Sequence, residues 1–271
     1  MKLGIVSDEV SEDLKVAAEW AVERGIKRFE LRRVWGERLP DGGKELLMKI
    51  KQMLDDYGIR VTGLSPGIYK CSLHESDFPK QGERLLRTME AADYLGTKKI
   101  VIFGIRKTPE DRPDDAKRVL ELLGDMCMTA SQNGFTICLE NEPGYYNGLP
   151  DEIEQVHKAL YQLGGRLNWD MGNLFMSGFS EYKEHYERFK PYIASVHMKD
   201  YRLEDGVCVP MGEGCIDWKG QIDDLIRDDI RFGTEEADMN IETHCSPEYE
   251  NATKCYDYIK RVMGEKFNEL L

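Results

Sequence analysis

The stretch Asp114–Glu140, D-D-A-K-R-V-L-E-L-L-G-D-M-C-M-T-A-S-Q-N-G-F-T-I-C-L-E, contains one complete structural unit. Its first part predicts an amphipathic helix over Asp114–Asn133, because apolar residues recur there at helical spacing. The following Gly134 is a helix stop, since glycine readily takes the left-handed conformation that closes a helix. The apolar run Thr136–Glu140 then predicts a buried strand. The residues that share one face of the predicted helix are Val119, Leu122, Leu123, Met126 and Ala130.

The same unit repeats on both sides of this stretch. Predicted helices end at Gly25, Gly58 and Gly96, each time shortly before a β-branched run. Short strands that alternate with longer amphipathic segments are typical of βα units around a parallel sheet. The 271 residues give about 34 residues for each of eight units, which is close to the size of a (β/α)8 barrel. The predicted strands are Lys2–Val6, Arg28–Arg32, Arg60–Leu64, Lys99–Phe103, Thr136–Glu140, Leu167–Asp170, Ala194–Lys199 and Asn240–Glu242.

We therefore predict an α/β protein with a single (β/α)8 TIM barrel, in which residues 1–271 form one domain. No Pro-, Gly- or Ser-rich linker divides the chain. The structural rival is a doubly wound open sheet, which usually carries a Gly-rich phosphate loop after its first strand. Ser7-Asp8-Glu9-Val10-Ser11 stands at that place instead of G-x-G-x-x-G. Closure of eight strands into a barrel fits better.

The composition restricts the classes of partner. Lys and Arg number 37 against 50 Asp and Glu, and the net charge of −13 argues against nucleic acid. No apolar run approaches the roughly 18 residues of a membrane span. The start of the chain lacks the apolar stretch of a signal peptide, so we expect a cytoplasmic protein without membrane contact. The seven Cys residues show neither C-x-x-C nor zinc-finger spacing, and we expect reduced thiols, several of them buried.

Polar residues end four consecutive predicted strands. The carboxyl ends of the strands form the active site of a TIM barrel, so these side chains are expected to meet. Three carboxylates there would repel one another unless protons or a cation neutralised them. Carboxylates with one neutral imidazole suit a divalent ion, Mn²⁺, Mg²⁺, Co²⁺ or Zn²⁺, and four protein ligands leave positions for a substrate. The four candidate ligands are Glu140, Asp170, His197 and Glu242.

Five motifs surround these residues: Leu139-Glu140-Asn141, Asp170-x-x-Asn173, His197-x-Lys199-Asp200, Gly212-Glu213-Gly214-Cys215-Ile216-Asp217-Trp218 and Ile241-Glu242. In order and spacing they resemble the xylose isomerase-like barrel superfamily, in particular its sugar-phosphate isomerase and epimerase branch. That branch includes the ketose 3-epimerases and the hydroxypyruvate isomerases. The N-terminal half matches only in its βα rhythm and in Phe29-Glu30-Leu31. The resemblance is therefore strong for the fold and weak for the substrate.

The resemblance implies that Glu140, Asp170, His197 and Glu242 ligate one divalent metal ion. It further implies a small sugar or sugar-phosphate substrate, whose enediolate the metal stabilises as a Lewis acid. Glu140 and Glu242 would then exchange protons as base and acid. Exchange on opposite faces of one carbon gives an epimer, and transfer between neighbouring carbons gives an aldose–ketose isomer. By family analogy we expect a homodimer or tetramer.

Five further residues are candidates for substrate binding. Asn173 stands where many ketose 3-epimerases carry His, and its amide can hydrogen-bond a hydroxyl. Arg202 lies one position earlier than the corresponding Arg of the relatives and can bind an anion. Lys199 is a candidate for a substrate oxygen or phosphate, although a salt bridge to a nearby carboxylate explains it equally well. Glu30, at the end of the second strand, and His74, in the loop after the third, complete the set.

Other polar residues have structural explanations. Gly212–Gly214 is expected to form a sharp turn, and Asp217 to cap the helix that follows. His244 comes two positions after Glu242, so strand alternation places both on one face if the strand extends that far, as a partner of Glu242, and a place in the following loop explains it equally well. His157 lies in a predicted outer helix and is expected to be structural or solvent-facing.

Three other functions were weighed against the isomerase or epimerase. Metal-dependent lyases that dehydrate inososes or dehydroshikimate share the scaffold and the metal cluster, and the sequence does not separate them from isomerases. A barrel that binds sugar without turnover would not need two glutamates beside the metal. Type IV apurinic endonucleases assemble three metals from a larger set of His residues, whereas this chain has five His and a charge of −13.

Overall fold

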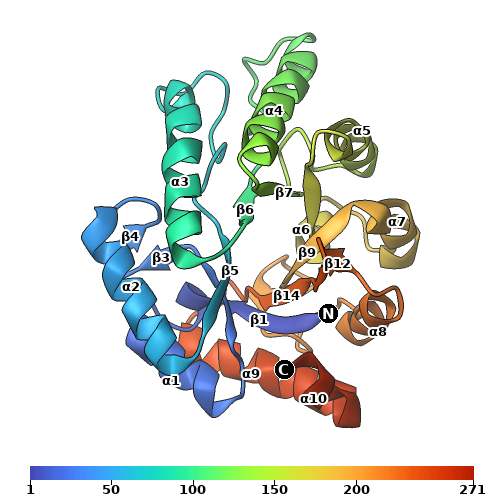
Figure 1. Cartoon of the computed structure of the whole chain (residues 1–271). Coiled ribbons are helices and arrows are strands. Elements are labelled where there is room, and N and C mark those ends of the chain that lie inside the picture. The colour runs from blue at the N-terminus through green and yellow to red at the C-terminus, as the bar shows by residue number, and fades with distance from the viewer.

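A computed structural model describes residues 1–271 and shows a closed barrel of parallel strands surrounded by helices (Figure 1). The strands follow one another around the barrel in the order β1, β14, β9, β8, β7, β6, β5, β2, and β2 pairs with β1 to close it. This arrangement confirms the predicted α/β class and the (β/α)8 TIM barrel. The barrel strands are β1 Lys2–Val6, β2 Arg28–Leu31, β5 Arg60–Leu64, β6 Lys99–Ile102, β7 Thr136–Glu140, β8 Arg166–Asp170, β9 Ile193–Met198 and β14 Asp238–Ile241.

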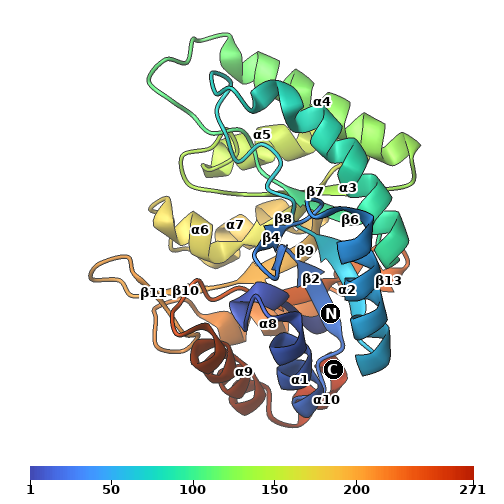
Figure 2. The same cartoon turned by 90° about the vertical axis from the view of Figure 1, so that its left-hand side faces the viewer.

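Helices connect the barrel strands and form an outer ring (Figures 1 and 2). The helix predicted over Asp114–Asn133 is observed as α4, Asp115–Gln132. Gly25, Gly58 and Gly96 have φ angles of 77°, 64° and 82°, as expected for helix stops. All eight predicted strands are present, with ends that differ by at most two residues. The helices are α1 Leu14–Glu23, α2 Gly43–Tyr57, α3 Gln81–Leu95, α4, α5 Pro150–Tyr161, α6 Met171–Met176, α7 Tyr182–Phe189, α8 Trp218–Arg227, α9 Glu248–Met263 and α10 Phe267–Leu270.

Three small hairpins that the strand pattern did not predict are added to the barrel. Two of them directly follow barrel strands, so they lie at its carboxyl end, where the β10–β11 hairpin projects from the body (Figure 2). The predicted seventh strand therefore stops at Met198, and the hairpin begins at Asp200. The hairpin strands are β3 Arg33–Val34 with β4 Glu37–Arg38, β10 Asp200–Tyr201 with β11 Cys208–Val209, and β12 Arg231–Phe232 with β13 Glu235–Glu236.

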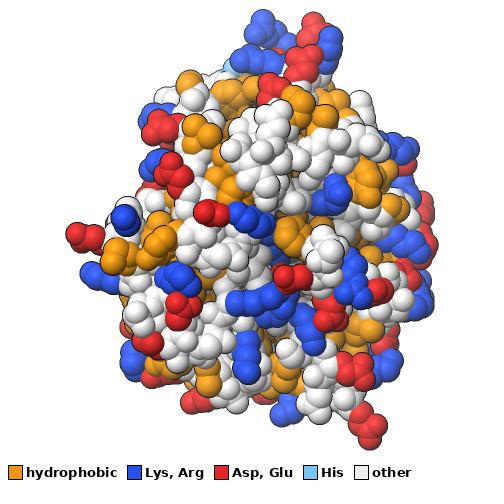
Figure 3. All heavy atoms as spheres, in the orientation of Figure 1, with side chains coloured by type: hydrophobic (Ala, Val, Ile, Leu, Met, Phe, Trp, Pro, Cys, Tyr) orange, Lys and Arg blue, Asp and Glu red, His pale blue; other side chains and the backbone are white.

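The molecular surface carries both signs of charge. Figure 3 shows Lys and Arg mixed with Asp and Glu over one face, with hydrophobic side chains scattered between them. Several acids pair with a base one turn away on the same helix, such as Lys51 with Asp55 at 3.0 Å and Lys219 with Asp223 at 2.6 Å. None of the helices combines the length and the apolar character that a membrane crossing requires.

The main hydrophobic core is a cluster of 68 buried residues, and a separate cluster holds three more. Its largest members, Trp20, Trp169 and Trp218, are at most 1% exposed. Truncation of such a side chain typically costs about 3–5 kcal/mol, so packing of the helices on the barrel supplies much of the stability. All seven Cys residues are free, and five of them are buried, as predicted.

The inside of the barrel is polar, even at its amino end. Lys99, the first residue of β6, is completely buried, and its Nζ lies 2.9 Å from Asp238 Oδ2 and 3.0 Å from Ser195 Oγ. Arg28 Nε donates to the other oxygen of Asp238 at 2.5 Å. Burial disfavours the charge of Lys99, but the carboxylates of Asp238 and Glu30 outweigh it and raise the pKa of Lys99. One carboxylate thus serves two cations inside the barrel.

Two glycines make room for these polar side chains. A β-carbon at Gly4 in β1 would overlap the side-chain oxygen of Asn240 in β14. A β-carbon at Gly63 in β5 would lie 2.7 Å from Lys99 Cε. Any larger residue at these positions would push a buried polar group away from its partners.

The variant Asp238→Ala leaves the Lys99 ammonium and the Arg28 guanidinium without their carboxylate. We expect the free energy of unfolding to fall by about 3–5 kcal/mol, because an uncompensated charge remains buried. Urea unfolding followed by circular dichroism measures this loss. The control Glu235→Ala removes an exposed partner of Arg60 and should change stability by less than about 1 kcal/mol. Equal losses in the two variants would contradict the stated role of Asp238.

His157 in α5 is buried, and neither of its ring nitrogens has a hydrogen bond. Burial lowers the pKa of His157 to about 3. In an unfolded chain the pKa of His is about 6.5. Between these values the unfolded chain binds a proton that the folded chain does not, so stability falls as the pH falls.

Replacement of His157 by Leu removes this proton linkage. Between about pH 5.5 and pH 4, the stability of the variant should depend on pH less steeply than that of the wild type, by about 1.4 kcal/mol per pH unit. Urea unfolding at a series of pH values measures the two slopes. Equal slopes, or a His157 ring that titrates near pH 6 in an NMR experiment, would contradict the prediction.

Candidate metal centre and active site

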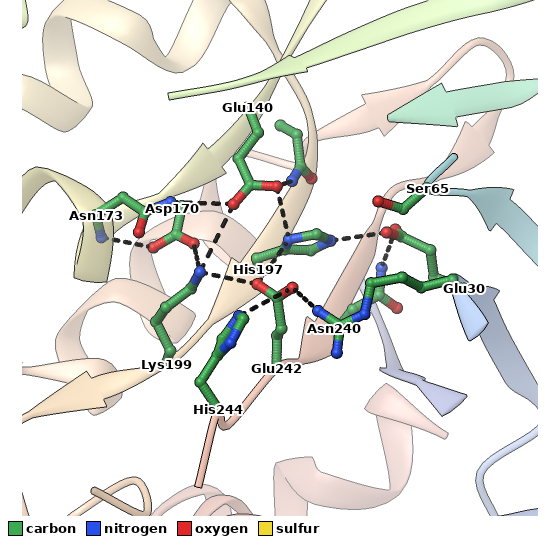
Figure 4. A network of polar contacts seen from close by, with 12 residues as sticks. Glu30, Ser65, Glu140, Asp170, Asn173, His197, Lys199, Asn240, Glu242 and His244 are labelled. Carbon is green, nitrogen blue, oxygen red and sulfur yellow. Dashed lines mark hydrogen bonds and ion pairs between the residues drawn. The ribbon is translucent and has the colours of Figure 1, made fainter. Parts of the chain in front are cut away.

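Neighbouring barrel strands bring four side chains of metal-ligand type to the carboxyl end of the barrel (Figure 4). Glu140 and Asp170 are the last residues of β7 and β8. His197 is the last but one residue of β9, and Glu242 directly follows β14. All four are buried, and one donor atom from each lies within 4.8 Å of the others. The structure thus brings together the four candidate ligands that the sequence indicated.

The buried atoms of this group have the chemistry of a divalent-cation site. Asp170 Oδ2, His197 Nδ1 and Glu242 Oε2 are buried and lack a well-formed hydrogen bond. Other charged atoms lie nearby, since His197 Nδ1 is 3.2 Å from Glu140 Oε2 and 3.0 Å from Glu242 Oε2. Three carboxylates and one imidazole suit Mn²⁺, Mg²⁺, Co²⁺ or Zn²⁺. These residues could therefore hold one such ion.

Glu30 of β2 orients the imidazole ring of His197. His197 Nε2 lies 3.0 Å from Glu30 Oε1, and Asn240 Nδ2 donates to the other oxygen of Glu30 at 3.1 Å. Burial disfavours a charge on His197, but the three surrounding glutamates outweigh it and raise the pKa of His197 well above its usual value. Glu30, which the sequence placed among the substrate ligands, instead directs Nδ1 of His197 toward the other ligands, as carboxylates behind metal-binding imidazoles do.

Lys199 supplies positive charge among the carboxylates. Its Nζ lies 2.7 Å from Asp170 Oδ2, 2.9 Å from Glu242 Oε2 and 3.6 Å from Glu140 Oε1 (Figure 4). Burial opposes this charge, but the carboxylates raise the pKa of Lys199 well above its usual value. The sequence offered two explanations for Lys199, a substrate ligand or a salt bridge. The geometry shows salt bridges from Lys199 to these carboxylates.

The three carboxylates differ in their pKa. Burial raises the pKa of Asp170 to about 7, against the lowering effect of Lys199. For Glu140, burial is outweighed by His197, and the pKa is lowered to about 2. For Glu242, burial is outweighed by His197 and Lys199, and the pKa lies well below its usual value. Both glutamates are therefore ionised at neutral pH and can accept a proton.

Two asparagines fix Glu140 and Asp170 in place. Asp170 caps the short helix α6, and its Oδ1 accepts from the backbone amide of Asn173 at 2.8 Å. Asn173 Nδ2 donates to Glu140 Oε1 at 3.0 Å. Asn141 donates to the carbonyl oxygen of Asp170 at 2.7 Å and accepts from its amide at 3.0 Å. Asn173 thus lies beside the four candidate ligands and positions Glu140, and its contact with a substrate stays a prediction.

Arg32 holds Glu242 and was not identified from the sequence. Arg32 Nη1 donates to Glu242 Oε1 at 2.9 Å, and its other nitrogens donate to Asp8 Oδ2 at 2.9 Å and to Glu9 Oε1 at 2.6 Å. Burial opposes the charge, but the three acids raise the pKa of Arg32 above its usual value. The sequence contained one indication of this role. Arg32 lies two residues after the inward-facing Glu30, so strand alternation directs both side chains inward.

His244 connects Glu242 with solvent. Its Nε2 lies 3.2 Å from Glu242 Oε1, and 37% of its side chain is exposed. Its backbone amide donates to Glu9 Oε2 at 2.7 Å. The charge of Glu242 raises the pKa of His244, and burial opposes it. His244 can therefore carry protons between Glu242 and water.

Asp200 anchors the loop beside the site. Its carboxylate accepts from the backbone amides of Gly212 at 3.0 Å and Ile216 at 3.1 Å. Asp217 then caps α8 by accepting from the amide of Gly220 at 2.9 Å. The turn and the helix cap predicted for this segment are both observed.

Two predicted substrate ligands do not join the cluster. Arg202 Nη2 pairs with Asp205 at 2.6 Å within the exposed β10–β11 hairpin. His74 Nε2 lies 3.1 Å from Asp111 Oδ1, in a separate group of loop residues. Strand alternation does not fix the direction of side chains in loops. A motif position suggested the role of Arg202, and a loop at the carboxyl end of the barrel suggested that of His74.

A cavity of about 320 Å³ opens over the cluster. Its size falls in the range of sites for small molecules, roughly 300–1,000 Å³. Another hollow, of about 590 Å³, lies at the amino end of the barrel around Arg28 and Phe232, away from these ligands. The residues of the cluster that line the smaller cavity are Glu140, Asn173, Lys199, Glu242 and His244.

A family model described as the xylose isomerase-like TIM barrel matches residues 18–262, which include the whole cluster. The chain belongs to the xylose isomerase-like TIM barrel family. The resemblance inferred from the five motifs is thereby confirmed. No curated protein matches the chain by sequence.

Solved structures of similar fold include proteins with different activities. A D-tagatose 3-epimerase-like protein is 19% identical with a TM-score of 0.78, and the match covers 99% of this chain and 99% of that one. The probable 3-DHS dehydratase AsbF of Bacillus anthracis is 17% identical with a TM-score of 0.78, covering 96% and 99%. The IOLI protein with a bound zinc atom is 17% identical with a TM-score of 0.77, covering 100% and 99%. At these identities the likeness shows the shared fold of the xylose isomerase-like barrels.

We expect this xylose isomerase-like barrel to bind Mn²⁺ at one site per chain. The variant His197→Ala removes one donor and should weaken binding by at least about 100-fold. His197 must lose its proton to become a ligand, so binding should release protons and weaken as the pH falls. Calorimetric titration of chelator-treated protein in two buffers of different ionisation enthalpy measures the affinity and the proton release.

The matched control for this titration is His74→Ala. His74, Asp111 and Asp115 form another group with metal-ligand chemistry, in which His74 is exposed and Asp115 is buried. The control should bind Mn²⁺ as the wild type does. Absence of binding to the wild type, or a loss in His74→Ala without a loss in His197→Ala, would contradict the assignment of the site.

Proposed function

We propose that the protein is a divalent-metal-dependent isomerase or epimerase of a small sugar or sugar phosphate. The observation that carries this proposal is the pair of buried glutamates, Glu140 and Glu242, on either side of His197 Nδ1 at 3.2 Å and 3.0 Å. Two ionised carboxylates beside one open cavity suit proton transfer to and from a carbon next to a carbonyl group. The epimerase-like relative of similar fold supports the same class of reaction.

The metal would be held by Glu140, Asp170, His197 and Glu242. When bound, it would polarise the carbonyl group of the substrate and stabilise the negative charge that develops on its oxygen. Tight ligand spacing and burial at the end of the barrel favour this assignment. The IOLI structure, which contains zinc, supports metal binding in a barrel of this fold.

The side chains of this chain divide the proton transfers. One glutamate accepts the proton from the carbon, and the other delivers a proton to the opposite face or to the neighbouring carbon. Glu242 obtains its proton through His244, whose Nε2 lies 3.2 Å away and whose ring reaches solvent. Arg32 and Asn173 keep the two carboxylates in place through bonds of 2.9 Å and 3.0 Å. Lys199 lines the cavity and can donate to a substrate oxygen.

A metal-dependent dehydratase is the second candidate function. Two cationic acids, Lys199 and His244, lie 2.9 Å and 3.2 Å from Glu242 and could protonate a leaving hydroxyl group. The similarity to the Bacillus anthracis dehydratase fold is consistent with that use of the scaffold. Incubation with inososes and 3-dehydroshikimate, with product analysis for loss of water, separates a dehydratase from an isomerase.

Replacement of Glu140 or Glu242 by Gln should abolish proton exchange at the reacting carbon. In ²H₂O, the wild type with Mn²⁺ should incorporate deuterium into a ketose, a ketose phosphate or an inosose, as followed by NMR. Each variant should lower this rate by at least about 100-fold, since a positioned acid or base contributes roughly 10²–10⁴-fold. The control Glu213→Gln changes an exposed glutamate paired with Lys254 and should keep the rate.

The same experiment distinguishes an enzyme from a barrel that binds sugar without turnover. In that case the wild type would bind a sugar in calorimetry without exchanging any proton. The Glu242→Gln variant would then bind the same sugar with no activity to lose. Such a result would contradict the proposed function.

A further inference from the structure

Two basic residues flank the entrance to the cavity, and neither has a carboxylate within hydrogen-bond distance. Arg38 belongs to β4, and Lys70 lies in the loop after β5. Both line the cavity over the glutamates and a second hollow of about 620 Å³ beside it. The two spaces also share Arg32 and His244, so together they form one path from solvent to Glu242.

Arg38 has no carboxylate within ion-pair distance. Its Nη2 makes one long hydrogen bond, 3.4 Å, to the carbonyl of Ser65, and its Nε is buried without a partner. By contrast, Arg32 contacts three carboxylates at 2.6–2.9 Å. Burial and the charge of Arg32 lower the pKa of Arg38 to about 10, so Arg38 stays charged at neutral pH. Arg38 is half-buried, and a guanidinium with a buried, unpartnered nitrogen is normally paired with an anion.

The loop after β5 passes close to the Arg38 side chain. A β-carbon at Gly67, in the loop after β5, would lie 2.9 Å from Arg38 Nε and 3.0 Å from Arg38 Cζ. Gly67 has a φ of 76°, which favours glycine, so the loop passes close to the guanidinium. The absence of a side chain at residue 67 therefore leaves room for the Arg38 guanidinium at the entrance.

Lys70 lies close to the same entrance with its donors free. Its Nζ is 3.6 Å from Glu142 Oε1, beyond hydrogen-bond distance, and it stands over the ring of Phe103 at 4.3 Å. Its side chain is 42% exposed. The ammonium can thus turn toward a ligand while its stem stays on the aromatic ring.

We infer that Arg38 and Lys70 bind an anionic oxygen group, a carboxylate or a phosphate, on the substrate at the end remote from the reacting carbon. This inference rests on the proposed function and narrows its substrate class to anionic polyhydroxy carbonyl compounds. A guanidinium offers two parallel donors to either group, and a nearby ammonium adds charge.

Most of the acids that line the two spaces are already paired with a cation. Asp8 is bound to Arg32 at 2.9 Å, and the Glu242 carboxylate contacts Arg32 and Lys199 at 2.9 Å each. Glu142, which faces Lys70, has a pKa raised by burial and by Glu140. Among the cations that line the two spaces, Arg38 alone has no carboxylate within ion-pair distance.

Anion binding can be tested without the metal and without turnover. Chelator-treated protein is titrated in a calorimeter with inorganic phosphate and, separately, with glycolate. We expect Arg38→Gln and Lys70→Met to weaken binding by about ten- to a hundred-fold, the usual cost of a lost charge-assisted hydrogen bond. The control Arg33→Gln removes the same charge from the same hairpin, where Arg33 pairs with Glu12 at 3.0 Å, and should bind as the wild type does.

Each outcome of this titration either supports or overturns the inferred anion site. Binding of phosphate alone assigns a phosphate ester, binding of glycolate alone assigns a sugar acid, and binding of both assigns the shared oxyanion chemistry. No binding, or equal weakening in the Arg33→Gln control, overturns the inference. Lys70→Met keeps the test decisive if circular dichroism shows that Arg38→Gln does not fold.

A second measurement separates this inference from the proposed function. Deuterium exchange is compared for a neutral ketose, its phosphate ester and the corresponding keto sugar acid. Arg38→Gln should raise KM for an anionic substrate about ten- to a hundred-fold and leave kcat nearly unchanged, since Arg38 does not reach the reacting carbon. Equal kcat/KM for neutral and anionic compounds overturns the inference while the proposed function stands. Loss of phosphate binding in the variants, without exchange in any compound, supports the anion site and overturns the proposed function.

Discussion

Charge balance inside a closed barrel is the constraint on which the site depends. Closure forces inward-facing side chains from strands far apart in the sequence into one shared space with little water. Glu140, Asp170 and Glu242 meet there because their strands end at the same rim. Like charges at this spacing are tolerated only when cations lie between them. His197 and Lys199 supply those cations, and both come from the end of β9.

This balance extends along the barrel axis as well as around its rim. At the amino end, Asp238 is matched by Lys99 and Arg28, and further up Glu30 is matched by His197. Residues of β9 and β14 contribute to each of these charge-balanced groups. A substitution in one group therefore alters the contacts that position the next group along the axis. A substrate or a metal ion therefore meets ligands whose positions are set by several strands together. Such support is what an active site needs to keep its groups in productive geometry.

The sequence predicted the strands, the helix stops and the four side chains that meet at the carboxyl end, because each depends on local periodicity or on a position at a strand end. It did not predict the contact of Arg32 with Glu242 or of Lys99 with Asp238. These pairs lie 210 and 139 residues apart and exist only through barrel closure and strand register. Alternation shows that a residue points inward, but it does not show which residue it meets. Arg202 was assigned from a motif position in a loop, where neither periodicity nor register applies.

The glycines inside the barrel have a consequence for how such a chain can change over generations. Gly4 leaves space that Asn240 fills, and Gly63 leaves space that Lys99 fills. The interior volume is thus shared between neighbouring strands, β1 with β14 and β5 with β6, and a larger side chain on one strand has to be matched by a smaller one on the next. Accepted changes at residues 4 and 240 should therefore occur together, although 236 positions separate them. Large changes of interior residues in such a barrel therefore require paired substitutions that keep the total side-chain volume constant.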